Sequence, residues 1–200
     1  MADNGPVLLE TQRLVLREFT EHDVDLLVEL DSDPQVVHHI TGGRVTPRAE
    51  VEREVLPAFL AYHDRPDGYG FWAAVERTSG DFLGWFHLRP EHDHPPDEPE
   101  LGYRLRRAAW GRGLATEGSQ ALVDAAFGRL GAARVVASTM AVHVASRRVM
   151  EKAGLRFVRS FTQEWPYPIP GDEQGDVEYA ITRDQWQQDR DLAGTASQDG

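Results

Sequence analysis

The spacing of apolar residues changes abruptly within residues 100–130. Alternate residues from Leu101 to Leu105 are apolar, which is the pattern of a strand with one buried face. From Leu114 to Leu130 apolar residues recur every three or four positions, which predicts a helix. Gly111 and Gly113 lie between the two patterns and permit a turn that a side chain would hinder. The chain is therefore predicted to pass here from a strand through a tight turn into a helix.

The same two periodicities divide the rest of the chain. Thr46 followed by Pro47 is a helix start, and the helix that follows must tolerate or kink at Pro57. A hairpin turn over residues 77–81 joins two short strands. We expect further strands at 13–19, 71–75, 82–88, 134–140, 155–161 and 177–182, and helices at 21–30, 46–62 and 144–153.

Composition and length indicate one globular domain, and the predicted strands and helices place it in the mixed α/β class. The chain has 200 residues, of which 40% are hydrophobic and 27% charged. Residues 1–7 are expected to be a flexible lead-in and residues 8–188 a single domain. Residues 189–200 are expected to be a disordered tail, because Leu192 and alanines are their only apolar residues.

Several classes of function are excluded by the same composition. The chain has no cysteine, which excludes disulfides, thiolate metal sites and cysteine nucleophiles. Nothing resembles a signal peptide or a membrane span, so a cytoplasmic protein without membrane contact is expected. The net charge of −12 argues against a nucleic-acid partner and is compatible with a cationic one.

Against this acidic background, one short segment is basic. Four arginines lie within nine residues that lead into the glycine turn, which suggests a polyanionic ligand. The first turn of the following helix exposes backbone N–H groups at the positive end of the helix dipole, and such a turn suits phosphate. An ordinary strand–helix junction is the alternative. The four arginines are Arg104, Arg106, Arg107 and Arg112.

Three motifs carry a resemblance to a known family. The segment W-G-R-G-L-A-T-E, preceded by E-L-G-Y-R-L, resembles the pyrophosphate-binding signature of the GNAT superfamily of acyl-CoA-dependent N-acyltransferases. Residues 143–155 resemble that family's N-x-x-S-x-x-V-x-x-K-x-G-F segment, although His143 replaces the usual Asn. Ala108 replaces the Gln or Arg that begins the glycine motif. The opening T-Q-R-L-V-L-R-E-F resembles the RimJ/RimL-type branch, which acetylates the N-termini of ribosomal proteins.

The resemblance, which covers residues 8–188, implies a fold and a cofactor site. The implied fold is a central, mostly antiparallel sheet of about seven strands, flanked by helices and splayed at the acyl-CoA site. Acetyl-CoA is the implied co-substrate, bound largely by backbone amides. The residues implied to contact it are Leu105, Arg106, Arg107, Trp110, Gly111, Arg112, Gly113, Leu114, Ala115, Thr116, His143 and Arg147.

Two residues are candidates for the chemistry of acyl transfer. Glu100 is the candidate base or amine-orienting carboxylate, against the alternatives of a solvated strand-end charge or a water chain. Ser146 is the candidate proton donor to the leaving thiolate, against the alternative of a helix-cap hydroxyl. With no cysteine and no G-x-S-x-G elbow, direct attack by the amine is expected rather than an acyl-enzyme.

The acceptor is left open at this stage. A protein or peptide N-terminal α-amine follows from the branch, whereas a small amine or antibiotic is served by the same scaffold. An acyl-CoA-binding protein without turnover and a nucleotide-binding oxidoreductase are further alternatives. No metal is expected from His92-Asp93-His94, and a monomer or homodimer is expected. The candidate residues of the acceptor pocket are Asp31, His38 with its neighbour His39, Trp72, Trp85 and Tyr103.

Overall fold

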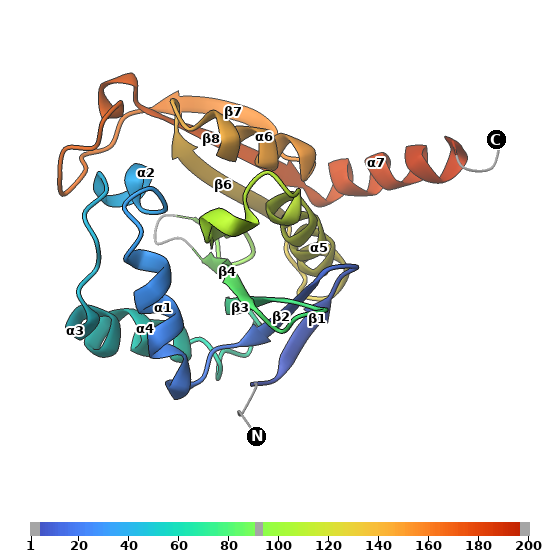
Figure 1. Cartoon of the computed structure of the whole chain (residues 1–200). Coiled ribbons are helices and arrows are strands. Elements are labelled where there is room, and N and C mark those ends of the chain that lie inside the picture. The colour runs from blue at the N-terminus through green and yellow to red at the C-terminus, as the bar shows by residue number, and fades with distance from the viewer. Residues whose placement is uncertain (1–4, 91–93, 197–200) are drawn as a thin grey trace.

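The computed structural model describes residues 5–90 and 94–196, which form one mixed sheet with helices on both faces (Figure 1). The strand order is β1-β2-β3-β4-β5-β6-β8-β7, and every neighbouring pair is antiparallel except β5 and β6. The predicted mostly antiparallel sheet is confirmed, with eight strands in place of about seven. The strands are β1 (Val7–Glu10), β2 (Leu14–Glu18), β3 (Gly70–Glu76), β4 (Phe82–Pro90), β5 (Pro99–Leu105), β6 (Arg134–Met140), β7 (Arg156–Phe161) and β8 (Asp176–Thr182).

The additional strand, β1, begins at the last residue of the expected lead-in and continues into the predicted domain. Val7 pairs with Arg17 of β2, and the amide of Glu18 donates to the carbonyl of Pro6 at 2.8 Å. Leu8 and Leu9 pack against the core, which stabilises a strand too short to show a clear alternation. The predicted boundary between residues 7 and 8 therefore falls inside β1, one residue after its start, and residues 1–4 lie outside the described part of the chain.

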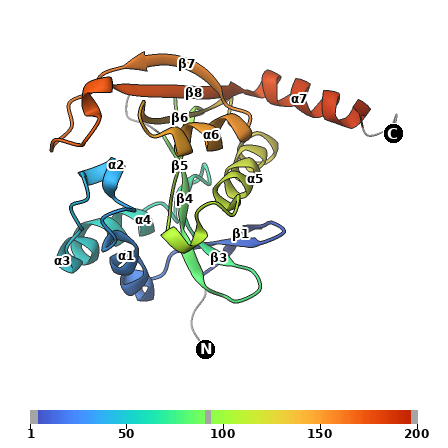
Figure 2. The same cartoon turned by 45° about the horizontal axis from the view of Figure 1, so that its top comes forward.

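Two helical layers cover opposite faces of β3–β5 (Figure 2). Trp72 and Ala74 of β3 belong to the apolar cluster that contains α5 and α6, whereas Phe71 and Ala73 belong to the cluster that contains α1 and α4. Successive residues of a strand point to opposite faces, so β3 separates the two layers. The helices are α1 (Val24–Asp31), α2 (His38–Thr41), α3 (Arg48–Glu50), α4 (Leu56–Leu60), α5 (Leu114–Gly128), α6 (Val144–Lys152) and α7 (Arg183–Ala196).

The helix predicted from Thr46 to Tyr62 is interrupted before its proline. A π-helical turn, Val51–Val55, connects α3 with α4, and the amide of Leu56 donates to the carbonyl of Val51. Pro57 has no N–H to donate, so the ordinary helical ladder cannot run through it, and the wider turn accommodates the break. This π turn lies in the layer that covers β3 and β4.

At the C-terminal end, the structure departs from the predicted disordered tail. Helix α7 continues past residue 189 to Ala196 and extends away from the sheet (Figure 1). Its Trp186 donates to Asp124 of α5 at 2.7 Å, and Arg190 pairs with the same carboxylate. These side-chain contacts anchor a helix that has few apolar residues, which is why hydrophobic periodicity did not predict it.

Candidate active site

The sheet opens between β5 and β6, the pair of parallel strands. Strands β4 and β5 share seven register positions, whereas β5 and β6 share one, Glu100 opposite Val136. Beyond this position the two strands diverge, which confirms the predicted splay. The gap between them begins beside Glu100 and widens toward Leu105.

Backbone groups of β5 face this gap. The amide of Arg106 donates to the carbonyl of Leu83, which sets the alternation of hydrogen bonds between β5 and β4. By that alternation the amides of Leu101, Tyr103 and Leu105 point away from β4 and toward β6. The predicted backbone donor at Leu105 therefore lies at the open end of the gap.

The glycine turn begins where β5 ends. Gly111 and Gly113 have φ of 69° and 77°, a backbone conformation that is strained for residues with a side chain. Gly113 is the N-cap of α5 and no side chain caps it, and the first helical hydrogen bond runs from the amide of Glu117 to the carbonyl of Gly113. The amides of Leu114, Ala115 and Thr116 consequently have no acceptor within the helix, which makes this turn suited to an anion.

Contacts from distant residues hold the turn in place. The carboxylate of Glu117 accepts from the amide of Arg13 at 2.8 Å and from the hydroxyl of Thr11 at 2.5 Å. Arg13 also donates to the carbonyl of Arg112 at 2.8 Å. The indole N–H of Trp110 donates to the carbonyl of Leu105 at 2.7 Å. The turn is thereby fixed to the end of β5 and to the segment before β2.

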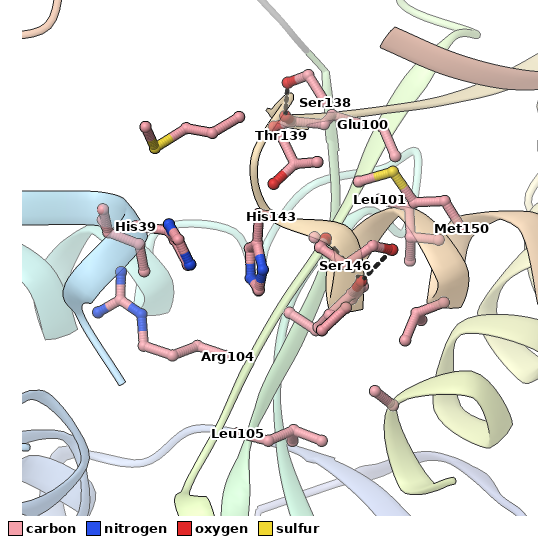
Figure 3. A pocket seen from close by; sticks show the side chains of 18 of the residues that line it. His39, Glu100, Leu101, Arg104, Leu105, Ser138, Thr139, His143, Ser146 and Met150 are labelled. Atoms are coloured by element: carbon pink, nitrogen blue, oxygen red, sulfur yellow. Dashed lines mark hydrogen bonds between the residues drawn. The ribbon is translucent and has the colours of Figure 1, made fainter. Parts of the chain in front are cut away.

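A cavity of about 1040 Å³ connects the glycine turn with the gap. Its walls come from the turn, both diverging strands, the first turn of α6, α2 and the segment after β7. Figure 3 shows His143 lying between His39 of α2 and Ser146 of α6, with Glu100 farther along the gap. The cavity therefore brings together residues that lie far apart in the sequence.

Glu100 is a mostly buried carboxylate in a hydrogen-bonded group. Its side chain is 12% exposed and accepts from Arg89 at 2.7 Å and from Ser138 at 3.3 Å. The ring of His87 lies 3.5 Å from it, Nε2 to Oε2. The alternative of a solvated strand-end charge is therefore wrong, because the carboxylate is mostly buried and accepts hydrogen bonds from Arg89 and Ser138 at the base of the gap.

Ser146 is buried in the first turn of α6, where its hydroxyl is hydrogen-bonded to the phenol of Tyr103. Its hydroxyl lies 2.9 Å from that of Tyr103, which also donates to the Ser146 carbonyl at 3.2 Å. Burial raises the pKa of Tyr103 to about 12, so the phenol keeps its proton at neutral pH. No side chain caps α6, so the capping roles considered for Ser146 and His143 are not used.

His143 stacks on a histidine from the other side of the cavity. Its ring lies 4.2 Å from that of His39, with 25° between the planes. Burial, reinforced by His39 and His38, lowers the pKa of His143 to about 4, and burial likewise lowers that of His39. Of the adjacent pair, His39 lines the cavity, whereas the predicted His38 is exposed. Both stacked rings are neutral at pH 7.

The arginine-rich segment is not an unbalanced positive patch. Arg104 pairs with Asp31 at 2.5 Å and Arg106 with Glu29 at 2.6 Å. Arg107 pairs with Asp33, and Arg112 with Glu76. The expectation of a basic surface was wrong because residues far away in the sequence supply a carboxylate for each guanidinium. Of these four arginines, only Arg104 lines the main cavity.

Two more residues that were predicted to line the site, Arg147 and Trp72, do not line the main cavity. The guanidinium of Arg147 donates to the Tyr179 hydroxyl and the Ala141 carbonyl, both at 3.1 Å, whereas Arg148 lines the cavity. Trp72 is buried in the core under α5 and lines neither cavity found in the described structure. Its role as a pocket residue is a wrong prediction, since β4 and β5 separate β3 from the gap and the indole packs in the core.

A second cavity of about 350 Å³ adjoins the first on the side of α1–α4. Asp31 and Trp85, both predicted as pocket residues, line it, and Trp85 also lines the main cavity. The four residues that line both cavities are Trp85, His87, Arg89 and Arg104.

His87 and Arg89 are site residues that the sequence prediction missed. They follow Trp85 at alternate positions of β4, so all three side chains share one face of the strand. Polar residues at the inward positions of a buried strand are an unusual pattern, and this signal was available in the sequence. His94 also lines the main cavity, but His92 and Asp93 lie outside the described residues.

Within residues 5–90 and 94–196, no three metal-binding side chains come together. In the same ranges no helix has the combination of length and apolar character needed to span a bilayer.

Comparisons with known proteins agree with this geometry. Residues 13–156 match the family described as the Acetyltransferase (GNAT) domain. FsC-acetyl coenzyme A-N(2)-transacetylase of Aspergillus fumigatus is 35% identical over 185 residues, which are 89% of this chain and 77% of that protein. The structure of aminoglycoside acetyltransferase AAC(6')-Ib with coenzyme A has a TM-score of 0.70 at 21% identity, covering 88% of this chain and 99% of that one.

The chain belongs to the GNAT acetyltransferase family. It is an acetyl-CoA-dependent acetyltransferase, and the unpaired amides, the gap and the cavity fit that co-substrate. A narrower branch does not follow from the comparisons. A protein of Vibrio cholerae, provisionally described as a ribosomal-protein-serine acetyltransferase, is 18% identical with a TM-score of 0.67, covering 88% of this chain and 97% of that one. At that identity the likeness shows the fold alone.

Proposed function

We propose that this enzyme acetylates a primary amine of a small molecule by direct attack on acetyl-CoA in a ternary complex. The observation that carries the proposal is the main cavity, which joins the unpaired amides at Gly113 to Glu100 and Ser146. The diphosphate of the co-substrate would lie at the start of α5, and its pantetheine arm would lie in the gap beside β5. An amine entering from the side of α2 would then meet the thioester near Glu100.

Each proton of the reaction has a group to receive or supply it. Glu100 accepts a proton from the attacking ammonium, directly or through water, and the amine nitrogen bonds to the acetyl carbon. As the carbon–sulfur bond breaks, Ser146 donates its proton to the thiolate and takes one from Tyr103 at 2.9 Å. The second proton, which the nitrogen loses as the amide forms, returns to Tyr103 through water. An unpaired amide of β5 is the oxyanion donor. Polarisation and proximity supply the rest of the rate.

A covered entrance supports a small acceptor. Ile40 of α2 and Trp165 of the segment after β7 both line the cavity, and the two segments touch each other. The guanidinium of Arg44 lies 3.6 Å from the centroid of the Tyr167 ring, and Gly42 packs against the carbonyl of Pro168. These contacts narrow the entrance of the cavity, so that a small amine can enter it more easily than the surface of a folded protein can. Small amines are therefore better candidate acceptors than protein N-termini.

The proposal is tested by thiol release from acetyl-CoA with a panel of small amines and a peptide with a free N-terminus. Native mass spectrometry identifies the product. We expect acetylation of small amines, and a single-turnover rate reduced roughly 100-fold in Ser146→Ala with unchanged affinity for coenzyme A. Ser119→Ala, which also removes a buried serine hydroxyl, is the matched control. No thiol release with any acceptor, or transfer to the peptide alone, contradicts the proposal.

A further inference from the structure

The second cavity lies between β3–β5 and the layer of α1–α4. Its walls include Asp31 at the end of α1, Glu50 of α3 and Val55 of the π-helical turn. Single π turns within helices frequently occur at functional sites. The cavity opens beside Trp85 and His87, which also line the main cavity. A molecule that reaches Glu100 can therefore extend into it.

His87 is a buried polar side chain that the reaction does not use. Its ring is 8% exposed and packs against Gly102, where an added Cβ would lie 2.4 Å from Nε2. Within the described structure, Nδ1 is buried without a hydrogen-bond partner. Burial lowers the pKa of His87, so the ring is neutral at pH 7 and one nitrogen can accept a hydrogen bond. An unsatisfied buried nitrogen on a cavity wall indicates a missing donor.

The charges of the cavity favour a cation as that donor. The guanidinium of Arg104 is bound by Asp31 and lies 5.1 Å from the centroid of the Trp85 ring. The walls of the cavity therefore already surround one cationic side chain with a carboxylate and an aromatic ring. Arg89 donates to Glu100. Glu50 is half-buried, and no cation of the described residues pairs with it. An ammonium donates three hydrogen bonds, and Glu50, His87 and Thr46 offer acceptors for them.

We propose that the second cavity binds a cationic group at the far end of the acceptor, so that the preferred substrates are diamines. This inference rests on the proposed function, because the reacting amine must reach Glu100. One amine attacks the thioester in the main cavity while the second, still protonated, is held by Glu50 and His87. A monoamine of equal length leaves the carboxylate of Glu50 and Nδ1 of His87 unsatisfied.

The experiment compares 1,5-diaminopentane with pentylamine as acceptors for the wild-type enzyme, Glu50→Gln and Glu54→Gln. Glu54 lies on the same helical segment but is exposed and lines neither cavity, so it is the matched control. The wild type should have at least a tenfold higher kcat/KM for the diamine. Glu50→Gln should raise KM for the diamine about tenfold with kcat unchanged, and should leave pentylamine unaffected, whereas Glu54→Gln should behave as wild type.

Calorimetric titration of 1,5-diaminopentane into the enzyme without acetyl-CoA separates this inference from the proposed function. Binding that weakens in Glu50→Gln supports the cationic subsite even if no acceptor is acetylated. Equal kcat/KM for the two amines, or equal effects of Glu50→Gln and Glu54→Gln, overturns the subsite while acetylation of both amines leaves the proposed function standing.

Discussion

The two ends of the main cavity are built in different ways. At the α5 end, backbone amides within residues 111–116 provide the binding groups, and side chains only hold the turn in place. At the α1 end, where the second cavity adjoins it, side chains from distant segments meet in ion pairs, such as Arg104 with Asp31. A site made from backbone depends on conformation, whereas a site made from side chains depends on which residues are paired. Substitutions should therefore affect the two ends differently.

The largest effect is expected from Gly113→Val. Its φ of 77° is strained for any side chain, so the turn must change and the amides of α5 lose their common direction. Loss of two charge-assisted hydrogen bonds, each of about 1.5–3 kcal/mol, predicts coenzyme A binding weaker by roughly 100-fold or more, measured by titration calorimetry.

Gly80→Val is the control for that strain. Gly80 has the same φ of 77°, nothing within 4 Å of an added Cβ, and a position in the turn between β3 and β4. Both variants should lose stability, but only Gly113→Val should lose affinity. Equal affinities for the two variants would show that the α5 turn does not bind the diphosphate.

A second comparison uses the ion pairs at the α1 end. Asp31→Asn leaves the guanidinium of Arg104, whose side chain is 16% exposed, without its carboxylate. Removing one partner of a buried pair is costly, and we expect about 2–4 kcal/mol of lost unfolding free energy. Glu29→Gln breaks a pair whose carboxylate is 64% exposed and should cost under about 1 kcal/mol. Urea denaturation measures both, and similar losses would contradict the distinction.

The pH dependence of stability tests the stacked histidines between the two ends. The pKa of His143 is about 4 when folded and returns to its ordinary value of 6.5 on unfolding. Below pH 6.5 the unfolded chain therefore binds the extra proton, and stability falls until the pH reaches about 4. Between pH 7.5 and 5 this costs about 2 kcal/mol, since one pKa unit corresponds to about 1.4 kcal/mol.

Replacing His143 by Asn should remove that part of the pH dependence. Denaturant midpoints of wild type and His143→Asn should differ more at pH 5 than at pH 7.5. Parallel curves at the two pH values would show that His143 is protonated equally in both states.

The smallest effect is expected from Arg112→Gln. Although this arginine lies inside the glycine motif, its guanidinium pairs with Glu76 and does not line the cavity. Coenzyme A affinity should change less than about twofold, because surface ion pairs contribute little. A tenfold loss of coenzyme A affinity would show that the Arg112 side chain contacts the cofactor. It would contradict the claim that backbone amides provide the binding groups at this end.

These contrasts explain which parts of the site could be predicted from sequence. The glycine turn, the start of α5 and the opposing strands lie within short stretches, so motif and periodicity located them. The partners of Arg104 and Arg106 lie 73 and 77 positions away, and no local pattern connects them. The stack of His39 on His143 likewise depends on the packing of α2 against α6.

The fold shows the same division. Strands β2 to β8 follow from alternation, whereas β1 depends on pairing with β2 and α7 on side-chain contacts with α5. Trp72 and Trp85 are both tryptophans of inner strands, but only the register of the sheet decides which one faces the cavity. Sequence patterns identified the kinds of element, and tertiary contacts decided which side chains reach the site.

The most direct test of the central claim is amide hydrogen exchange with and without coenzyme A. The account predicts protection in peptides that cover residues 101–105 and 110–117, with no change in the turn at residues 77–81. Protection confined to other segments, with exchange at 110–117 unaltered by saturating coenzyme A, would contradict it.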